Sequence, residues 1–525
     1  MKLKALLVGI EYVVLQNVEQ LEKAEVLNVT KDSRTVEAGD VFVCVRGTKN
    51  NGHDHIWEAF KKNVNVFLVE RRNVEGKVLE FPEQALVIQV MNTRAAYAVM
   101  AANYWGHPAD ELILIGITGT KGKTTVSMII KKLLEAQGEC VGLIGTMGIF
   151  DGEEWNSSKN TTPDAFTIHK YFDKMKGKGC RYVIMEVSSQ GIKQQRICGL
   201  TFEVAVFTNL GEDHIGPEEH HSFEEYRYYK SKLFAQCRKG ICNLDDLASA
   251  YMFRRRQCRK YGFSCQRELC CMKQLESDRV LRADQIEYVW ENGRPSTRFL
   301  VEDETFFLKL PGLFNVYNAL AALAVMRCLA YDIRTMKKEL ADVLINGRME
   351  MISNDKNIAC YIDYAHNGLS LKEVLTTLRT YDPGRIILVF GCGGNRAKSR
   401  RLEMGKAAGK YADHVIITTD NPRYEDPEKI AEEIVEGLGK ENDIYEIILD
   451  RKEAVARAIA IAEEKDMVVI AGKGHEQYQE IEGIRYEMDD HELLKEVLLE
   501  LSVGAPTDKQ AEEQERVEET ECTQT

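Results

Sequence analysis

The chain has 525 residues, enough for about two to four domains, and a formal net charge of -13. This acidic balance excludes a surface built to bind nucleic acid or an anionic membrane, so any anionic ligand must be held by a local group of residues. The sequence also contains no apolar run long enough to cross a bilayer, and we expect a cytoplasmic monomer without nucleic-acid or membrane partners.

Zinc binding is not expected from the cysteines. Six of the 14 cysteines fall between residues 237 and 271, but they form no paired C-x-x-C units and no histidine stands at the spacing of a zinc finger. Free, partly buried thiols in a reducing compartment are the expected state.

The first block, residues 1–108, has the pattern of a small α/β domain. Apolar runs at 41–46 and 64–71 predict strands, and apolar residues at helical spacing between 55 and 64 predict a helix. A short mixed sheet with helices is therefore expected here.

The second block, residues 109–345, opens with a β-branched run at 111–121 that ends in glycines. A helical pattern follows this run directly. The run, the glycines and the helical pattern together predict the strand, turn and helix of a nucleotide-binding sheet. Further buried strands are expected at 182–186 and 204–210, and a helix at 315–330.

The third block, residues 346–500, again alternates strands with helices. We expect strands at 386–391, 414–420 and 467–473 and helices at 401–412 and 427–438. This pattern predicts a second doubly wound, Rossmann-like domain. Residues 501–525 are polar and acidic with few large apolar residues, so a disordered tail is expected.

Residues 119–125 (GTKGKTT) have the features of a phosphate-binding loop. The general phosphate-loop pattern requires glycine at position 117, where this chain has Ile117, so only the GKT core of that pattern is present. The physical elements are still there: glycines expose backbone N–H groups, the helix N-terminus adds its dipole, Lys123 neutralises charge and the Thr124 hydroxyl suits magnesium. Nucleotide binding is predicted.

Polar residues at the ends of the neighbouring strands predict a metal site. Glu186 ends one predicted strand, and Asp213 and His214 follow the next. Because the carboxyl ends of parallel strands lie at one edge of a sheet, these groups should face the loop and bind magnesium.

A second ligand-binding edge is predicted in the third block. Residues 391–396, 420–423 and 472–476 follow three successive strands and carry glycines, arginines and a carboxylate. The planar guanidinium groups of Arg396 and Arg423 suit a ligand with a free carboxylate. Two such domains indicate a reaction in which ATP is used to join two molecules, and pattern alone goes no further.

The chain resembles the Mur ligases in a series of short motifs that run in order from about residue 32 to about residue 498. The motifs are TGTKGKTTV at 118–126, NTTPD at 160–164, MEVSSQG at 185–191, TNLGEDHI at 208–215, LPGLFNVYNALAA at 310–322, NGRMEM at 346–351, IDYAHN at 362–367, VFGCGGNRA at 389–397, TDNPRYEDPE at 419–428 and AGKGHEQYQ at 471–479.

The resemblance implies an α/β fold of three domains. It implies a UDP-substrate-binding domain at 1–108, a central P-loop-type ATP-binding domain at 109–345 and an amino-acid-binding domain at 346–500. The implied activity is that of an ATP-dependent ligase that adds the third stem-peptide amino acid to UDP-MurNAc-L-Ala-D-Glu during peptidoglycan synthesis. The small-molecule substrates would be ATP, the UDP-MurNAc-dipeptide and meso-diaminopimelate, with Mg2+ as cofactor.

The resemblance also implies roles for individual residues. Catalysis would depend on Lys123, Glu186, His214 and Lys230, and Lys230 would be an N6-carboxylysine; Lys232 is a second candidate. Thr124, Glu186, His214 and carbamylated Lys230 would bind magnesium. ATP would contact Gly119, Thr120, Lys121, Gly122, Lys123, Thr124, Thr125, Asn318, Arg348 and Asp363. The UDP substrate would contact Ser33, Asn160, Thr161, Thr162, Ser188 and Arg196. The amino acid would contact Arg396, Asp420, Asn421, Arg423, Gly472 and Glu476.

The resemblance alone leaves more than one amino acid as the acceptor. The DNPR sequence at 420–423 favours diaminopimelate over lysine, because its distal carboxylate offers Arg423 a partner that lysine lacks. Three departures from the family pattern, at Gln190, at Ile215–Gly216 and at Asn367–Gly368, leave room for a relative with L-lysine or another acceptor or donor.

Two rival reaction classes would also use the phosphate loop. One is a ligase of the folylpolyglutamate or cyanophycin type, which the DSR sequence at 32–34 and the DNPR sequence disfavour. The second is a non-ligating P-loop NTPase, which would not need the third block.

Overall fold

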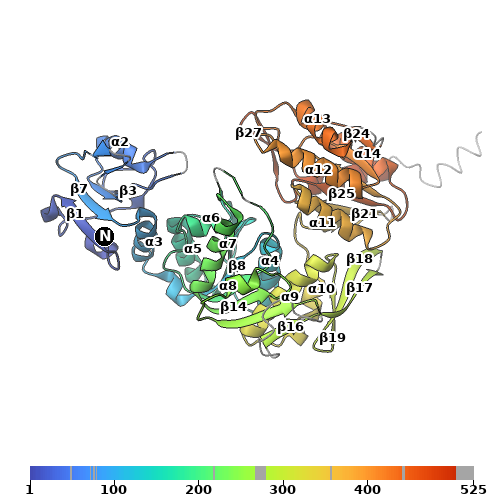
Figure 1. The fold of residues 1–525 in the computed structure, drawn as a ribbon, viewed down its shortest axis with the longest axis horizontal. Helices are drawn as coiled ribbons and strands as arrows, with labels where there is room; N and C mark the ends of the chain where they lie inside the picture. Colours follow the sequence, from blue (N-terminus) through green and yellow to red (C-terminus); the bar gives the residue numbers. More distant parts are fainter. Residues whose placement is uncertain are drawn as a thin grey trace, which may run out of the picture. The chain divides into compact units, whose positions relative to one another are not determined.

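The structure is a computed structural model. It describes residues 1–47, 50–70, 73–74, 77–78, 80–213, 215–216, 219–266, 279–291, 293–354, 358–439 and 444–503. The chain separates into two compact units (Figure 1). The first unit contains 1–284, 300–305 and 316–340, and the second contains 285–299, 306–315 and the chain from 341 onward.

The two units differ from the three blocks expected from sequence. The first unit contains the first block and most of the second, whereas residues 285–299, 306–315 and 341–345 of the predicted central block belong to the second unit. The exact boundaries of three domains therefore stay a prediction. The last helix, α15 (Asp490–Val503), extends beyond the predicted start of the tail at 501, and residues 504–525 lie outside the described residues.

The N-terminal part of the first unit is a five-stranded sheet with helices on both faces. Its strand order is β1-β7-β4-β3-β2, with β1 antiparallel and the others parallel. Side chains of α1 and α3 pack on one face, and those of α2 pack on the other. The elements are α1 (Leu3–Leu6), β1 (Tyr12–Gln16), β2 (Val29–Thr30), β3 (Val41–Val43), α2 (Ile56–Lys61), β4 (Val66–Val69), β7 (Leu86–Val90) and α3 (Thr93–Tyr104).

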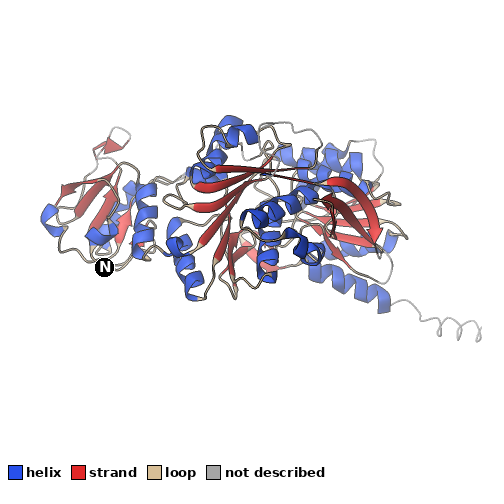
Figure 2. Cartoon of the chain, turned by 90° about the horizontal axis from the view of Figure 1, so that it is seen from below, coloured by secondary structure: helices blue, strands red, loops and turns tan. Residues whose placement is uncertain are grey.

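The central sheet has nine strands in the order β11-β10-β9-β12-β8-β13-β14-β15-β16; β10 is antiparallel to both of its neighbours, and all the other pairs are parallel. Figure 2 shows these strands flanked by helices. The strands are β8 (Ile113–Thr118), β9 (Val141–Gly145), β10 (Gly148–Phe150), β11 (Trp155–Asn156), β12 (Tyr182–Glu186), β13 (Phe202–Phe207), β14 (Cys237–Asn243), β15 (Arg259–Ser264) and β16 (Val280–Arg282). The helices are α4 (Lys123–Ala136), α5 (Ala165–Gly177), α6 (Ser189–Lys193), α7 (Phe223–Lys232), α8 (Ser249–Met252), α9 (Leu313–Cys328) and α10 (Lys337–Ala341).

The strand order of this sheet explains where its ligands are expected. β8 lies in the middle and runs into the glycine loop, with β12 on one side and β13 on the other. Because the three strands are parallel, their carboxyl ends open on one edge, as the sequence predicts. A separate three-stranded sheet follows, made of β17 (Asp284–Glu291), β18 (Arg294–Val301) and β19 (Glu304–Leu308).

The sheet of the second unit is doubly wound. Its order is β20-β21-β25-β22-β23-β24, parallel except for the edge strand β20. Helices α11, α12 and α13 bury apolar side chains on one face, and α14 and α15 do so on the other. The elements are β20 (Glu350–Ile352), β21 (Ala359–Asp363), α11 (Gly368–Arg379), β22 (Ile386–Phe390), α12 (Lys398–Tyr411), β23 (His414–Ile417), α13 (Pro427–Leu438), β24 (Tyr445–Ile447), α14 (Arg451–Ile461), β25 (Met467–Ala471), β26 (Tyr478–Ile481) and β27 (Ile484–Glu487).

The α/β fold class is confirmed, and every helix and strand expected from sequence overlaps one in the structure. Within the described part of the chain, no helix is both long enough and apolar enough to cross a membrane.

Helices α12 and α13 cross at a contact between glycines, which yields a stability prediction. A Cβ at Gly405 would lie 2.2 Å from the carbonyl oxygen of Ile434 and 2.9 Å from the Cα of Gly437. We expect Gly405→Ala to destabilise the second unit by about 1–3 kcal/mol, because the helices must separate. Thermal unfolding followed by circular dichroism should show a lower midpoint.

The control for this prediction is Gly177→Ala at the end of α5, where an added Cβ would meet no atom within 4 Å. That change should be neutral or stabilising by up to about 1 kcal/mol, since alanine favours a helix more than glycine does. If Gly405→Ala were also neutral, the close packing of α12 against α13 would be wrong.

Candidate active site

The glycine loop between β8 and α4 depends on two glycines. A Cβ at Gly119 would lie 1.9 Å from Oγ1 of Thr208, and one at Gly122 would lie 2.4 Å from Oδ1 of Asn318. Gly122 also has a φ of +82°, in the left-handed region, and stands at the N-cap of α4 without a side-chain cap. The first N–H groups of this helix therefore point to the place where a phosphate would bind.

The ammonium group of Lys123 folds back onto its own loop. Nζ donates to the carbonyl oxygens of Gly119 at 2.9 Å and Thr120 at 3.1 Å. Two residues at the end of β13 hold the loop from outside: Thr208 donates to the carbonyl oxygen of Lys121 at 2.6 Å, and Asn209 accepts from the Lys121 N–H at 2.9 Å. Both residues lie in the motif TNLGEDHI at 208–215, but no role was predicted for them from sequence.

The carboxylate of Glu186 is fully buried at the end of β12 and is surrounded by donors. It accepts hydrogen bonds at 3.0 Å from the hydroxyl of Thr124 and from both the hydroxyl and the N–H of Thr146. A Cβ at Gly145 would lie 2.3 Å from Oε1 of Glu186, so only glycine fits beside it. Sequence reasoning missed Thr146; its position directly after the strand that ends at Gly145 is the signal for it.

Lys230 extends from α7 to the same loop and is 1% exposed. Its Nζ donates to the carbonyl oxygen of Gly119 at 2.7 Å and lies 4.4 Å from the ring centre of Tyr226. Burial lowers the pKa of the Lys230 ammonium well below its ordinary value, and the nearby charge of Lys123 lowers it further. Lys232, the second candidate, instead lies over the ring of Tyr228.

The group around Glu186 suits a hard divalent cation. A carboxylate and two threonine hydroxyls offer oxygen ligands, which magnesium prefers, and magnesium keeps several water ligands of its own. Over the described ranges, no three His, Cys, Asp or Glu side chains gather into a metal site. The predicted ligand His214 lies outside the described residues. Asp213 is 3.9 Å from Nζ of Lys121.

Four predicted substrate residues form one cluster beside Glu186. Thr161 is 3.0 Å from the hydroxyl of Thr146, and Thr162 donates to the carbonyl oxygen of Glu186 at 2.8 Å. Thr162 also donates to Ser188 at 3.1 Å, and Arg196 donates to the carbonyl oxygen of Thr162. Another predicted residue, Asn160, is exposed next to this cluster in sequence.

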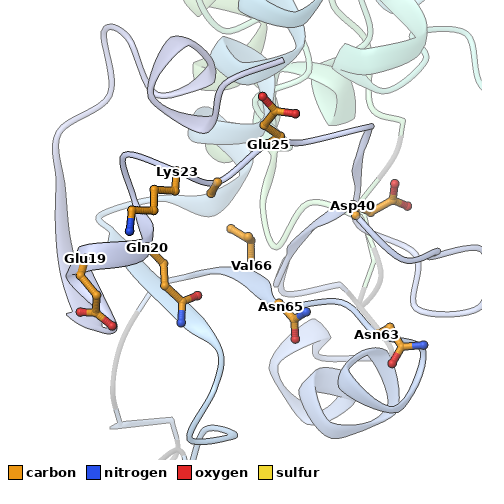
Figure 3. A pocket seen from close by; sticks show the side chains of 10 residues that line it. Glu19, Gln20, Lys23, Glu25, Asp40, Asn63, Asn65 and Val66 are labelled. Atoms are coloured by element: carbon orange, nitrogen blue, oxygen red, sulfur yellow. The ribbon is translucent and has the colours of Figure 1, made fainter.

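Ser33 follows β2 and is 7% exposed, with its hydroxyl 3.4 Å from Glu58. A cavity of about 350 Å³ lies at the opposite, amino edge of the same sheet, and Ser33 does not line it (Figure 3). The labelled side chains around it are Glu19, Gln20, Lys23, Glu25, Asp40, Asn63, Asn65 and Val66. The structure gives this cavity no relation to the predicted UDP-substrate residues.

In the second unit, Arg396 and Arg423 converge on Gly393. A Cβ at Gly393 would lie 2.9 Å from Nη1 of Arg423 and 3.9 Å from Cγ of Arg396. Arg396 is exposed, whereas Arg423 donates to the carbonyl oxygen of Gly394 at 2.8 Å and lies 3.3 Å from Glu480. The guanidinium of Arg423 and the side-chain stem of Arg396 therefore lie near Gly393, and a guanidinium group is suited to bind a carboxylate.

The other predicted acceptor residues lie at the ends of β23 and β25. Asn421 donates to Glu476 at 2.9 Å, and a Cβ at Gly472 would lie 2.7 Å from Oδ2 of Asp420. A residue not assigned from sequence, the buried Lys473, donates to Oδ1 of Asn421 at 3.3 Å and lies 3.6 Å from Glu476. Glycines and carboxylates at these strand ends suit an ammonium group.

The predicted ATP ligands divide between the two units. Asn318 belongs to the first unit with the loop, and Arg348 and Asp363 belong to the second. The guanidinium of Arg348 stacks 4.4 Å from the ring centre of Tyr364, and Asp363 accepts from the N–H of Met349 at 2.8 Å.

Gly122 allows a steric test of the loop. We expect Gly122→Ala to weaken adenine nucleotide binding by about tenfold or more, because the methyl group collides with Asn318 in addition to straining the backbone. The matched control is Gly138→Ala after the other end of α4, where φ is +81° and the added Cβ meets nothing within 4 Å. Calorimetric titration with ATP should separate the two variants; equal affinities would contradict the assigned site.

Comparison with known families and structures gives a consistent result. Three family models match: Mur ligase family, catalytic domain (25–105), Mur ligase middle domain (117–326) and Mur ligase, glutamate ligase domain (347–474). The chain is 37% identical over 500 residues to the UDP-N-acetylmuramoyl-L-alanyl-D-glutamate--2,6-diaminopimelate ligase of Clostridium perfringens, covering 95% of this chain and 99% of the relative.

Two solved structures have similar folds. One is of a UDP-N-acetylmuramoyl-L-alanyl-D-glutamate--2,6-diaminopimelate ligase, with a TM-score of 0.64 and 27% identity over 96% of this chain and 99% of that chain. The other, MurF ligase from Thermotoga maritima in complex with ADP, has a TM-score of 0.57 and 19% identity over 92% and 99%, and shows the fold alone. With its three domain matches and this identity over nearly its whole length, the chain belongs to the Mur ligase family.

Proposed function

We propose that this protein adds meso-diaminopimelate to UDP-MurNAc-L-Ala-D-Glu with consumption of ATP. The observation that carries this proposal is a continuous chain of contacts in the first unit: Thr124 of the phosphate loop donates to Glu186, which accepts from Thr146, which contacts Thr161 of the predicted substrate cluster. A nucleotide phosphate and a second substrate would therefore meet at Glu186. The names of the relatives agree with this reaction.

The proposed reaction has two steps. First, a carboxylate oxygen of the D-Glu residue attacks the γ-phosphorus of ATP and the bond from that phosphorus to the β,γ-bridging oxygen breaks. ADP departs, and the substrate now carries an acyl phosphate. Next, the amine of the amino acid attacks the acyl carbon, phosphate departs with the bonding electrons, and the nitrogen loses a proton. Lys123 and the N-terminus of α4 would stabilise the negative charge on the transferring phosphoryl group.

Magnesium would be held by Thr124, Glu186, His214 and a carbamylated Lys230. Bound there, it would neutralise charge on the phosphate oxygens. The buried Lys230 is suited to carbamylation, because the neutral amine is the form that adds CO2 and burial lowers the pKa of this lysine.

The acceptor assignment rests on the arginines at Gly393. Diaminopimelate carries a carboxylate at each end, and the guanidinium of Arg423, with the stem of Arg396 close to the same glycine, offers a partner for one of them. Lysine has only an ammonium group at its distal end, so it would leave that site without a partner. The neighbouring Glu476 and Asp420 would bind the ammonium groups.

The same proposal assigns one substrate to each predicted domain: the UDP substrate to residues 1–108, ATP to 109–345 and the amino acid to 346–500. We propose a cytoplasmic monomer, since ATP and a UDP-linked sugar are substrates of that compartment. Light scattering during size-exclusion chromatography tests the oligomeric state.

The experiment that tests the function is a phosphate-release assay with UDP-MurNAc-L-Ala-D-Glu and each of diaminopimelate, lysine and ornithine. We expect phosphate release and a product heavier by one acceptor residue with diaminopimelate. Preferred use of lysine would support the alternative acceptor. ATP hydrolysis that is equally fast without either substrate would support a non-ligating NTPase instead.

Arg423 yields a prediction about the acceptor. We expect Arg423→Ala to raise the KM for diaminopimelate about tenfold to a hundredfold, because a charge-assisted hydrogen bond is lost. The KM for ATP should change little. Arg457→Ala, which removes an exposed arginine paired with Glu446, is the control. Equal increases in both KM values for Arg423→Ala would rule out its role in acceptor binding.

Lys230 yields a prediction about CO2. In protein equilibrated with 13C-labelled bicarbonate, we expect a carbamate signal by NMR that is absent from Lys230→Arg and retained in Lys232→Arg. Because the pKa of Lys230 is lowered, its amine stays neutral to lower pH than an exposed lysine; the signal should disappear as the pH falls below that pKa. A signal that persists in Lys230→Arg would refute the carbamate at this residue.

A further inference from the structure

Arg451 is a buried arginine behind the predicted acceptor residues. Its side chain and that of Asp490 are both 0% exposed, and its Nε and Nη2 donate to the two carboxylate oxygens at 2.6 and 2.7 Å. Arg451 begins α14 and Asp490 begins α15, so the pair joins the first turns of the two helices that cover one face of the sheet.

The same guanidinium group also reaches two strand ends. Nη2 donates to the carbonyl oxygen of Ala471 at 3.2 Å, and Nη1 donates to that of Thr419 at 3.4 Å. Ala471 ends β25 and Thr419 follows β23, and β22 lies between these strands in the sheet. One planar group with five N–H donors can span this distance, which the single ammonium of a lysine cannot.

Both of these carbonyl groups directly precede acceptor residues. Thr419 is followed by Asp420 and Asn421, and Ala471 is followed by Gly472. The two segments approach closely, since a Cβ at Gly472 would lie 2.7 Å from Oδ2 of Asp420. A small change in the separation of the strand ends would therefore move both sides of the acceptor site.

A cavity of about 500 Å³ adjoins this arrangement. Arg451 and Arg423 both line it, together with Thr419. Arg451 thus contacts the carbonyl group of Thr419, at the start of the segment that leads to Arg423, as well as the end of β25.

We propose that Arg451, held in place by Asp490, is a positioning residue for the amino-acid acceptor: it fixes the distance between the turn that carries Asp420 and Asn421 and the turn that carries Gly472. The proposal rests on the proposed function of this unit. A buried ion pair by itself gives little net stability, and well-packed apolar side chains often replace one without loss. The contacts with two carbonyl groups give this pair a role that an apolar replacement would not fill.

The test compares two ion pairs in one sheet. Asp490→Asn keeps the shape of the side chain but removes its charge. Arg451→Lys keeps the charge but removes the planar guanidinium group that reaches several acceptors at once. The matched controls are Asp466→Asn and Arg385→Lys at the amino edge of the sheet, where Arg385 donates to Asp466 at 2.7 Å and to the carbonyl oxygen of Ile461 at 2.8 Å. The KM for diaminopimelate, for ATP and for the UDP substrate is measured for each protein.

We expect the two test variants to raise the KM for diaminopimelate about tenfold or more, as small misplacements in a site do, while the KM for ATP changes less than about twofold. The acyl phosphate, trapped with hydroxylamine in the absence of diaminopimelate, should form in both. The controls should lower the unfolding temperature without changing the KM for diaminopimelate.

The inference would be overturned if all three KM values rose together, or if the controls changed the KM for diaminopimelate as much as the test variants did. If Arg451→Lys does not fold, Asp490→Asn decides. A wild-type protein that forms no tripeptide would refute the proposed function. A wild-type protein that forms it, with an Asp490→Asn variant that changes only the unfolding temperature, would refute the positioning role alone.

Discussion

Two lysine side chains share one carbonyl oxygen at the centre of the first unit. Nζ of Lys123 and Nζ of Lys230 lie 2.9 and 2.7 Å from the carbonyl oxygen of Gly119. Two ammonium groups that share one acceptor repel each other, and the burial of Lys230 leaves little water to screen the repulsion. The repulsion is relieved when phosphate arrives, when Lys230 is neutral, or when Lys230 carries a carboxylate. The pKa of Lys230 is lowered first by its burial and then by the charge of Lys123, so the loop and α7 are coupled in part through charge.

The buried carboxylate of Glu186 completes this balance of charges. Its three hydrogen bonds come from Thr124 in the loop and Thr146 after β9, so residues from three neighbouring parallel strands or their loops meet at one side chain. Burying a carboxylate without partners is unfavourable in free energy, and these neutral donors reduce that unfavourable term without adding a positive charge. Thr146 also contacts Thr161, so the glycine loop and the cluster of predicted substrate residues are connected through Glu186.

The sequence was informative where burial leaves a simple pattern. The continuous apolar runs of β8, β12, β22 and β25 identify parallel strands, and the polar residues after them identify the ligand-binding edges. It was uninformative for β17, whose residues are mostly exposed and lack a clear apolar period. Thr146 was missed because the strand that ends at Gly145 was itself not predicted, and Lys473 was missed because a single lysine has no signature until the fold brings it to Asn421. The roles of Lys230 and Asn318 came from the family resemblance and not from pattern.

The two units place different sets of charged groups at the carboxyl edges of their sheets. The first unit places lysines and a helix N-terminus around the glycine loop, whereas the second pairs Arg423 with Glu480 and Lys473 with Glu476. An amino acid carries both charges, so the second arrangement matches it and the first does not. In the proposed reaction, the glycine loop and Glu186 would serve activation of the carboxylate, and the residues around Asp420 and Glu476 would serve capture of the acceptor. Substitutions in one group should therefore alter one step selectively, which makes the division of the reaction between the units measurable.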